Sequence, residues 1–224
     1  MIKIYCYKSL CQIFHYITIE VINKMLVGNY SMGQKGREIL EIDVSEVLRD
    51  LNSAYADEWL AHYQYFLYAQ VIEGIDAEEL KEKLEEQSKD EMNHAKELVN
   101  RILELGGKPT TKLTEASTCG FSEPPEDYSD LVRVIELVLE GERCAIEKYN
   151  NLAKKYHMKD LVTHEIFEDL LKDEVSDEEE WENFLPALKQ KQVEQRYKEQ
   201  SSSLPTSTTA EAATTAATQP ATQA

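Results

Sequence analysis

Carboxylates stand where core residues are expected along every long helix that this sequence predicts. In four stretches apolar residues recur every three or four positions, and one or two acids occupy the middle of each apolar stripe. Two stretches carry i, i+3 pairs, Glu91 with His94 and Glu174 with Asp177, each on one helix face. A buried carboxylate without a partner costs several kcal/mol, so such a convergence needs a cation. The interrupting acids are Glu58, Glu91, Glu142, Glu174 and Asp177.

The pattern of buried acids favours a pair of divalent metal ions as the bound cations. Carboxylates with one or two imidazoles suit iron or manganese and leave positions open for dioxygen or peroxide. Except at Asp177, the layout matches dimetal bundles in which two helices give one Glu each and two give Glu-x-x-His. His62, one turn from Glu58 on the same face, is either a further ligand or a hydrogen-bonded core histidine, and the sequence leaves both open. Chance is the competing explanation, because a chain with 42 Asp and Glu places some acids on nominal stripes.

The elements that must position these residues are four long helices. Gly and Pro occur mostly at the breaks between the periodic stretches, which include a tight turn at 73–75, a short turn near His157 and a long link at 106–126. Short turns force antiparallel neighbours, whereas the link is long enough to run the length of a bundle. The predicted fold is therefore all-α, a four-helix bundle with one long crossover between helices 2 and 3. The helices are expected near residues 44–73, 76–105, 127–155 and 158–185.

The two ends of the chain differ in composition from the bundle at 44–186. Residues 1–31 are rich in Ile, Tyr, Lys and Cys and have no acid before Glu20, so we interpret them as a doubtful N-terminal extension, with a natural start at Met32. A short arm at 32–43 would then precede the bundle. Residues 187–199 read as a short polar helix or linker, and residues 200–224, rich in Ser, Thr, Ala and Gln, as a disordered tail.

Composition excludes several classes of function. The chain has 224 residues, with 24 Lys and Arg against 42 Asp and Glu, for a net charge of -18. Such an excess of acid repels nucleic-acid phosphates and anionic lipids, so neither a nucleic acid nor a membrane is expected as a partner. Four cysteines without repeated close pairs do not describe a disulfide-stapled secreted domain, and no apolar run reaches membrane-spanning length. We expect a cytoplasmic protein.

Two of the stretches resemble bacterioferritins. The segment from Glu58 to Ala69 (EWLAHYQYFLYA) resembles their first helix, and Asp-Glu-Met-Asn-His-Ala at 90–95 resembles their second. The third and fourth helices agree more loosely, through Glu-Arg-Cys-Ala at 142–145 and Asp-Glu-x-x-Asp at 173–177, where Asp177 replaces the expected histidine. The resemblance implies a ferritin-like bundle with two iron ions per subunit, bridged by Glu91 and Glu174, and with Tyr65 close by. The implied iron ligands are Glu58, Glu91, His94, Glu142 and Glu174.

A second resemblance concerns two cysteines. Cys119 in the link and Cys144, two residues after Glu142, resemble the pair found in Dps-like thioferritins, which implies a homo-oligomeric cage of twelve subunits. Two thiols near iron could supply electrons or trap oxidised intermediates, although two unrelated buried cysteines would give the same pattern. Met92 follows Glu91 as the haem-ligating Met does in bacterioferritins. We favour a packing role for Met92 and expect no haem, because Dps-like cages are generally thought to lack it.

These observations predict a ferroxidase of the mini-ferritin type. It would oxidise Fe(II) with hydrogen peroxide or dioxygen and store ferric iron, which protects against oxidative stress. A non-storing di-iron or di-manganese enzyme, like rubrerythrin or manganese catalase, would use the same ligands without a closed cage. A non-catalytic helical scaffold is the alternative from another class, and it predicts a protein without bound metal.

Overall fold

A computed structural model describes residues 34–74 and 76–203, and in this part of the chain all regular structure is helical. None of the helices found there combines the length and apolar character needed to cross a membrane. The predicted N-terminal extension at 1–31 and all but the first residues of the predicted tail lie outside the described residues. The helices are α2 (Gln34–Glu38), α3 (Val44–Val71), α4 (Ala77–Glu104), α5 (Leu113–Ala116), α6 (Leu131–Tyr156) and α7 (Leu161–Ser203).

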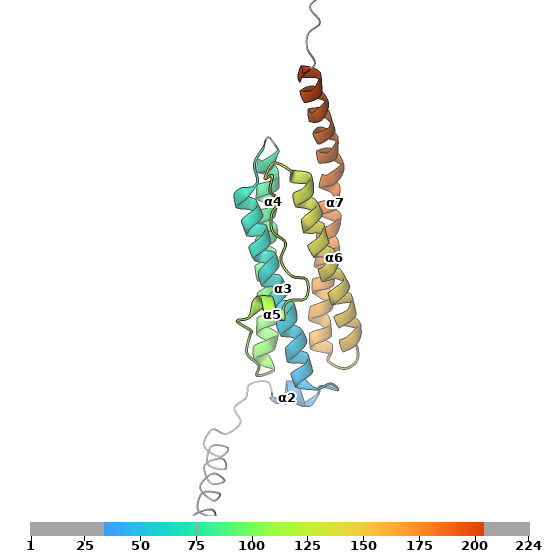
Figure 1. Ribbon diagram of the computed structural model, residues 1–224. Helices are drawn as coiled ribbons and strands as arrows, with labels where there is room; N and C mark the ends of the chain where they lie inside the picture. Colours follow the sequence, from blue (N-terminus) through green and yellow to red (C-terminus); the bar gives the residue numbers. More distant parts are fainter. Residues whose placement is uncertain (1–33, 75, 204–224) are drawn as a thin grey trace, which may run out of the picture.

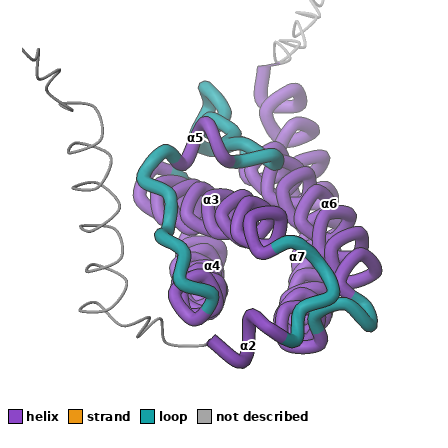
Figure 2. Tube along the Cα trace, turned by 90° about the horizontal axis from the view of Figure 1, so that it is seen from below, coloured by secondary structure: helices purple, strands orange, loops and turns teal. Residues whose placement is uncertain are grey.

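The four long helices form two antiparallel hairpins that pack side by side (Figure 1). One hairpin is α3 with α4, and the other is α6 with α7. The link between α4 and α6 carries the short helix α5 and runs back along α3 to the far end of the bundle (Figure 2). The predicted all-α class and single long crossover are therefore confirmed, although α6 begins at Leu131 and not near residue 127.

Helix α7 contradicts the expected end of the fourth helix near residue 185. It continues through Pro186 to Ser203, so the segment 187–199 is neither a separate helix nor a linker. A proline inside a helix removes one backbone hydrogen bond and crowds the preceding turn. Packing outweighs that cost, because Phe184, Leu185 and Leu188 all lie against the apolar core.

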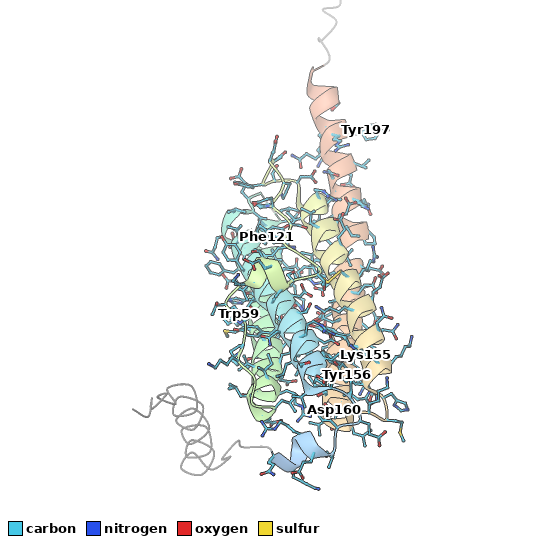
Figure 3. The ribbon with its side chains drawn as sticks, turned by 60° about the horizontal axis from the view of Figure 1, so that its bottom comes forward. Trp59, Phe121, Lys155, Tyr156, Asp160 and Tyr197 are labelled. Carbon is cyan, nitrogen blue, oxygen red and sulfur yellow. A yellow bond between two sulfur atoms is a disulfide. The ribbon has the colours of Figure 1, made fainter. Side chains whose placement is uncertain are left out.

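Polar contacts hold the next turn of α7 before the helix leaves the bundle. The ammonium group of Lys191 donates to Asp76 at 2.7 Å, and the amide of Gln192 donates to Asp130 at 3.3 Å. Beyond them α7 projects past the bundle, and Tyr197 is 71% exposed (Figure 3). Helix α7 therefore continues for about three turns beyond its contacts with the bundle at Lys191 and Gln192.

Side chains that cap the helix starts fix the ends of the hairpins. The Asp43 carboxylate accepts a hydrogen bond from the Ser45 amide at 2.7 Å and begins α3. The Asp130 carboxylate does the same for the Arg133 amide at the start of α6. Between α3 and α4, Gly74 has a φ of 118°, a conformation that favours glycine and closes the short turn.

The apolar core is divided into two clusters, one toward each end of the bundle. One surrounds Trp181 and includes Tyr65 and Tyr68, and the other surrounds Phe167 with Tyr149 and Tyr156. Along each long helix, the buried acids follow the residues of one cluster and precede the residues of the other. The bundle therefore holds a polar layer across its middle, and the cost of burying that layer is the first indication of a ligand.

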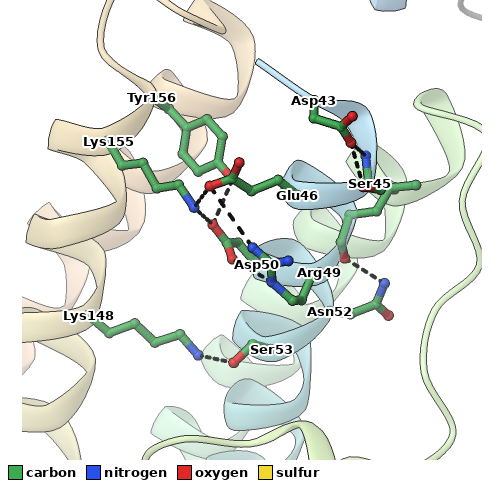
Figure 4. A network of polar contacts seen from close by, with 11 residues as sticks. Asp43, Ser45, Glu46, Arg49, Asp50, Asn52, Ser53, Lys148, Lys155 and Tyr156 are labelled. Atoms are coloured by element: carbon green, nitrogen blue, oxygen red, sulfur yellow. Dashed lines mark hydrogen bonds and ion pairs between the residues drawn. The ribbon is translucent and has the colours of Figure 1, made fainter.

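Ion pairs tie α6 to α3 outside this layer (Figure 4). The ammonium group of Lys155 lies 2.6 Å from a Glu46 carboxylate oxygen and 2.5 Å from one of Asp50. The Tyr156 hydroxyl donates to the same Asp50 carboxylate at 2.8 Å. About two turns earlier on α6, Lys148 donates to the Ser53 hydroxyl at 2.9 Å. These contacts connect the two hairpins along their seam.

Asp57 anchors the crossover to α3. Its buried carboxylate accepts hydrogen bonds from the backbone amides of Thr118 at 2.8 Å and Cys119 at 3.0 Å, and from the Ser117 hydroxyl. Lys148 of α6 makes an ion pair with the same carboxylate. Burial raises the pKa of Asp57, but Lys148 and the hydroxyl and amide donors outweigh it and lower that pKa. One side chain therefore joins α3, α6 and the link.

We expect Asp57→Ala to lower the free energy of unfolding by about 3 kcal/mol, because it leaves the mostly buried Lys148 and two amides without partners. Urea unfolding followed by circular dichroism measures this loss. Asp169→Ala removes an exposed carboxylate from α7 and should change the same free energy by less than about 0.5 kcal/mol. Equal effects of the two substitutions would contradict the anchoring role.

Candidate metal centre

Four of the sequence-predicted ligands meet in the polar layer. Glu58 of α3, Glu91 and His94 of α4, and Glu174 of α7 each place one donor atom within 4.8 Å of the others. All four residues are buried. His94 Nδ1 lies 3.4 Å from Glu58 Oε2 and Glu91 Oε2, and 3.5 Å from Glu174 Oε1. Three helices thus direct three carboxylates and one imidazole at a common point.

Three donor atoms at this point lack hydrogen-bond partners in the described part of the chain. Glu58 Oε2, Glu174 Oε1 and His94 Nδ1 are buried, and none of them has a hydrogen-bond partner in the described part of the chain. Buried polar atoms are nearly always hydrogen-bonded, so three unsatisfied atoms facing one point indicate a missing ligand. Oxygen-rich ligation with an imidazole nitrogen suits iron or manganese. The residues present therefore fit a bound divalent cation.

Burial in the layer disfavours the charged carboxylates. Burial, reinforced by the Glu91 charge, raises the pKa of Glu58 well above its usual value. The same two causes raise the pKa of Glu174 to about 8. Burial and the Glu174 charge raise the pKa of Glu142. Without metal, this layer therefore holds protons that a divalent cation would displace.

Glu91 and His94 carry the charge that the metal-free layer retains. Burial would raise the pKa of Glu91, but contacts from His94 and Glu58 outweigh it and lower that pKa. Burial would lower the pKa of His94, but Glu174, Glu58 and Glu91 surround the imidazole and raise its pKa. In the metal-free protein, protonated His94 therefore supplies the positive charge beside the carboxylates. Its other ring nitrogen, Nε2, lies 3.4 Å from Asp173 Oδ2.

Glu142 and Tyr65 extend the layer beyond the four converging residues. The Tyr65 hydroxyl donates to Glu142 Oε1 at 2.5 Å, and both side chains are buried. Burial and the neighbouring carboxylates raise the pKa of Tyr65, so the phenol keeps its proton. Glu142 therefore reaches the layer from α6, as the sequence predicted, with Tyr65 as its hydrogen-bond donor.

The structure does not bring Asp177 or His62 into the converging group. Asp177 Oδ2 accepts a hydrogen bond from Gln87 Nε2 at 2.5 Å, and burial raises its pKa to about 6. His62 is half-buried, and its Nδ1 donates to the Ser88 carbonyl oxygen at 2.7 Å. The hydrogen-bonded alternative for His62 is therefore the one that its geometry supports, and Asp177 lies at the edge of the layer.

Two residues beside the centre were not predicted as part of it. Gln87 is fully buried and donates to both Glu91 and Asp177, so it orients two carboxylates. Asp173 contacts the outward nitrogen of His94, the position from which a carboxylate orients a ligating imidazole. Gln87 had a signal in the sequence, because a polar residue one turn before Glu91 occupies the same apolar stripe.

A cavity of about 160 Å³ gives access to the centre between α3, α6 and the crossover. Its lining includes Glu58, Glu142 and Tyr65 from the layer and Cys119 from the link. Cys119 and Cys144 form a disulfide with a Cα–Cα distance of 5.7 Å, which joins the link to α6 at this cavity. The two cysteines singled out in the sequence are therefore partners beside the candidate centre.

A second opening lies on the other face of the bundle, between α4 and α7. Its lining is acidic and includes His94. Met92, two residues before His94 on α4, is half-buried. The acids around this opening are Asp90, Glu97, Asp173 and Asp177.

Comparison with known proteins agrees with this architecture. The family model for the ferritin-like domain matches residues 48–191, which is more than half of the chain and includes every residue of the polar layer. The chain belongs to the ferritin-like domain family. Among solved structures, this ferritin-like chain is similar to a dodecameric thioferritin, the bacterioferritin-related protein from Bacteroides fragilis. That match has 30% identity and a TM-score of 0.67, and covers 72% of this chain and 98% of the other.

Curated relatives include both branches suggested by the sequence. The ferritin-like chain is 29% identical to a DNA protection during starvation protein from Pyrococcus furiosus, over 69% of this chain and 86% of the relative. It is 31% identical to bacterioferritin from Desulfovibrio desulfuricans, over 58% of this chain and 69% of the relative. The solved structure of the D. desulfuricans protein, which describes a diiron site, matches with a TM-score of 0.56 at 28% identity, over 66% of this chain and 82% of the other.

Proposed function

We propose that this protein is a mini-ferritin that oxidises Fe(II) and stores the ferric product. The observation that carries the proposal is the set of unsatisfied buried donor atoms on Glu58, His94 and Glu174, which converge where a metal ion would satisfy them. The bacterioferritin and Dps relatives support iron as that metal. Manganese satisfies the same donors, so the metal is an outcome of the experiment below.

The proposed ligands are five residues that hold two iron ions. Glu91 and Glu174 would be shared by the two ions, as the resemblance to bacterioferritins implies, and Glu58 with His94 would hold one ion and Glu142 the other. Tyr65 keeps Glu142 oriented through its 2.5 Å hydrogen bond. We do not assign a ligand role to His62, and Asp177 acts through Gln87.

The chain contributes orientation and protons to the oxidation. Fe(II) binding displaces the protons that burial keeps on Glu58, Glu142 and Glu174. Two Fe(II) ions supply two electrons to one hydrogen peroxide, which takes up two protons and leaves as two waters. Because both electrons come from adjacent ions, no one-electron radical is released. The small cavity beside Tyr65 admits an oxidant of peroxide or dioxygen size.

The acidic opening between α4 and α7 is the proposed route for iron. Asp90, Glu97 and Asp173 give it a negative potential, which raises the local concentration of Fe(II). The net charge of -18 extends the same attraction over the molecule. A direct role in coating nucleic acid is not proposed, because the same charge repels phosphates.

We further propose a cage of twelve copies, supported by the similarity to the dodecameric thioferritin and by the Cys119–Cys144 pair. In this proposal the disulfide adds a covalent tie to the Asp57 contacts that hold the link beside the cavity. Haem is not part of the proposal, and Met92 is assigned a packing role.

The test is light scattering coupled to size-exclusion chromatography with in-line metal analysis. The full chain is measured before and after anaerobic Fe(II) followed by hydrogen peroxide. A particle of about twelve subunits that takes up far more than two irons per chain supports storage. A small oligomer that saturates at two irons contradicts storage and supports the non-storing enzyme. A protein that binds no metal contradicts the centre altogether.

A further inference from the structure

A pair of histidines lies at the turn between α6 and α7, outside the polar layer. His157 ends α6 and His164 belongs to the first turn of α7. Their rings pack edge to face, with centroids 4.9 Å apart and planes at 70°. The turn sits at the end of the bundle marked by Tyr156 and Asp160 (Figure 3). The closest ring nitrogens, His157 Nδ1 and His164 Nε2, are 3.4 Å apart.

One backbone carbonyl contacts the ring of His164 and the main chain of His157. His164 Nδ1 lies 2.9 Å from the Ala153 carbonyl oxygen, which can only accept, so this nitrogen carries the proton. The lone pair of the neutral ring is therefore on Nε2, toward His157. The same Ala153 carbonyl also accepts the His157 amide at 3.0 Å. A single carbonyl thus fixes the position of one histidine and the tautomer of the other.

The turn itself is rigid. Met158 has a φ of 64°, in the left-handed region that few side chains adopt without a cause. Asp160 is buried and accepts two hydrogen bonds from Arg101 of α4, at 2.9 and 3.0 Å. It also accepts from the Thr163 amide at 3.2 Å, which begins α7. The turn that carries the two histidines is therefore held by buried contacts that do not involve the imidazole rings.

We propose that His157 Nδ1 and His164 Nε2 bind a divalent transition-metal ion of the zinc and copper class. Two nitrogens that lie about 2.05 Å from a tetrahedral Zn²⁺ are separated by about 3.4 Å. The observed separation of 3.4 Å therefore leaves room for the ion without moving the turn. The bond from His164 Nδ1 to a carbonyl is the orienting contact that metal-bound imidazoles usually make.

Glu168 supplies a third donor on the same helix. It follows His164 by four residues, and its Oε2 lies 3.8 Å from the same His164 Nε2. Its side chain is 50% exposed, and its other carboxylate oxygen lies 3.7 Å from the Lys172 ammonium group, so Glu168 would turn from Lys172 toward the ion. Water completes the coordination. Imidazole donors favour Cu²⁺ and Zn²⁺ over harder ions, so this site differs in selectivity from the carboxylate layer.

The proposed site is independent of the iron chemistry. None of its three residues contacts the layer formed by Glu58, Glu91, His94 and Glu174. Bound metal would cross-link the end of α6 to the start of α7 and stabilise the native state by mass action. Loss of the site would therefore leave Fe(II) oxidation unchanged.

The test compares zinc binding by the full chain and three variants. His157→Gln and His164→Gln each remove one donor, and Glu165→Gln removes an exposed neighbouring charge as the matched control. Equilibrium dialysis against Zn²⁺ with metal analysis gives ions bound per chain. Wild-type protein and Glu165→Gln are expected to bind one ion per chain more than either histidine variant. Taking the difference cancels zinc held by the carboxylate layer.

A second measurement identifies the donors. Electron paramagnetic resonance with Cu²⁺ should give a wild-type minus His157→Gln difference spectrum with coupling to two nitrogens. Circular dichroism and particle size establish that each variant is folded. If His164→Gln fails to fold because its Ala153 contact is lost, the exposed His157→Gln variant decides alone. Equal zinc counts and no copper difference between wild-type protein and His157→Gln overturn the proposal.

Discussion

Replacement of Glu174 by Gln is expected to abolish metal binding at the centre and to slow Fe(II) oxidation by about 100-fold or more. Loss of a residue that only supports a ligand costs about 10- to 100-fold, and Glu174 is a proposed bridge between two ions. The variant keeps the volume of the side chain, so the bundle should fold. Absorbance of the ferric product after mixing with peroxide measures the rate, and metal analysis measures the loss of bound iron.

Glu179→Gln is the matched control for this substitution. Glu179 lies five residues further along α7 and is exposed, so the change removes one charge from the same helix without touching the layer. Its oxidation rate should stay within about twofold of wild type. A wild-type rate in Glu174→Gln would contradict the proposed centre, whereas slow oxidation in both variants would indicate that charge attraction alone matters.

Without metal, the protein is expected to lose stability as pH rises from about 4.5 to about 8. Folded Glu174 has a pKa of about 8 against a usual value of 4.5, so between these values the folded protein binds more protons than the unfolded chain. Raising the pH then favours unfolding. Glu58, Glu142 and His94 also have raised pKa values and act in the same direction. We expect a total loss of about 4 kcal/mol or more, measured by urea unfolding.

The Glu174→Gln variant and metal-loaded protein provide the controls for the pH dependence. Glutamine does not titrate, so the variant should lose less stability over the same range. Bound Mn²⁺ takes the place of the protons, so the loaded protein should gain stability relative to the metal-free protein as pH rises. A metal-free protein whose stability is flat or rises over this range would contradict a buried, protonated carboxylate layer.

The fold could be predicted from local patterns because each hairpin is specified by its own periodicity and breaks. Gly74 marks a turn that the structure contains, and the long link allows only a crossover. The end of the fourth helix could not be predicted in the same way. Pro186 is a local signal for the end of a helix. The free energy gained when Leu188 and its neighbours pack on the apolar core exceeds the free energy that the proline costs.

The candidate centre was predictable where an acid broke an apolar stripe, as at Glu58 or Glu142. Contacts between side chains of different helices could not be predicted in this way. Asp177 has the right spacing from Glu174, but Gln87 of another helix takes up its carboxylate. Likewise, nothing in the sequence near Asp57 indicates that it holds the crossover, since its partners lie about 60 residues further along the chain.

The division of the centre between two hairpins has a consequence for biosynthesis. The α3–α4 hairpin carries Glu58, Glu91 and His94, and the α6–α7 hairpin carries Glu142 and Glu174. Chains are made from the N-terminus, and local hairpins form before distant segments pair. A nascent chain that has emerged only as far as α4 therefore presents three of the five proposed donors, which would hold iron weakly. If the proposed centre binds iron, tight binding therefore requires α7 to have left the ribosome and docked, and only a finished subunit would be loaded with reactive metal.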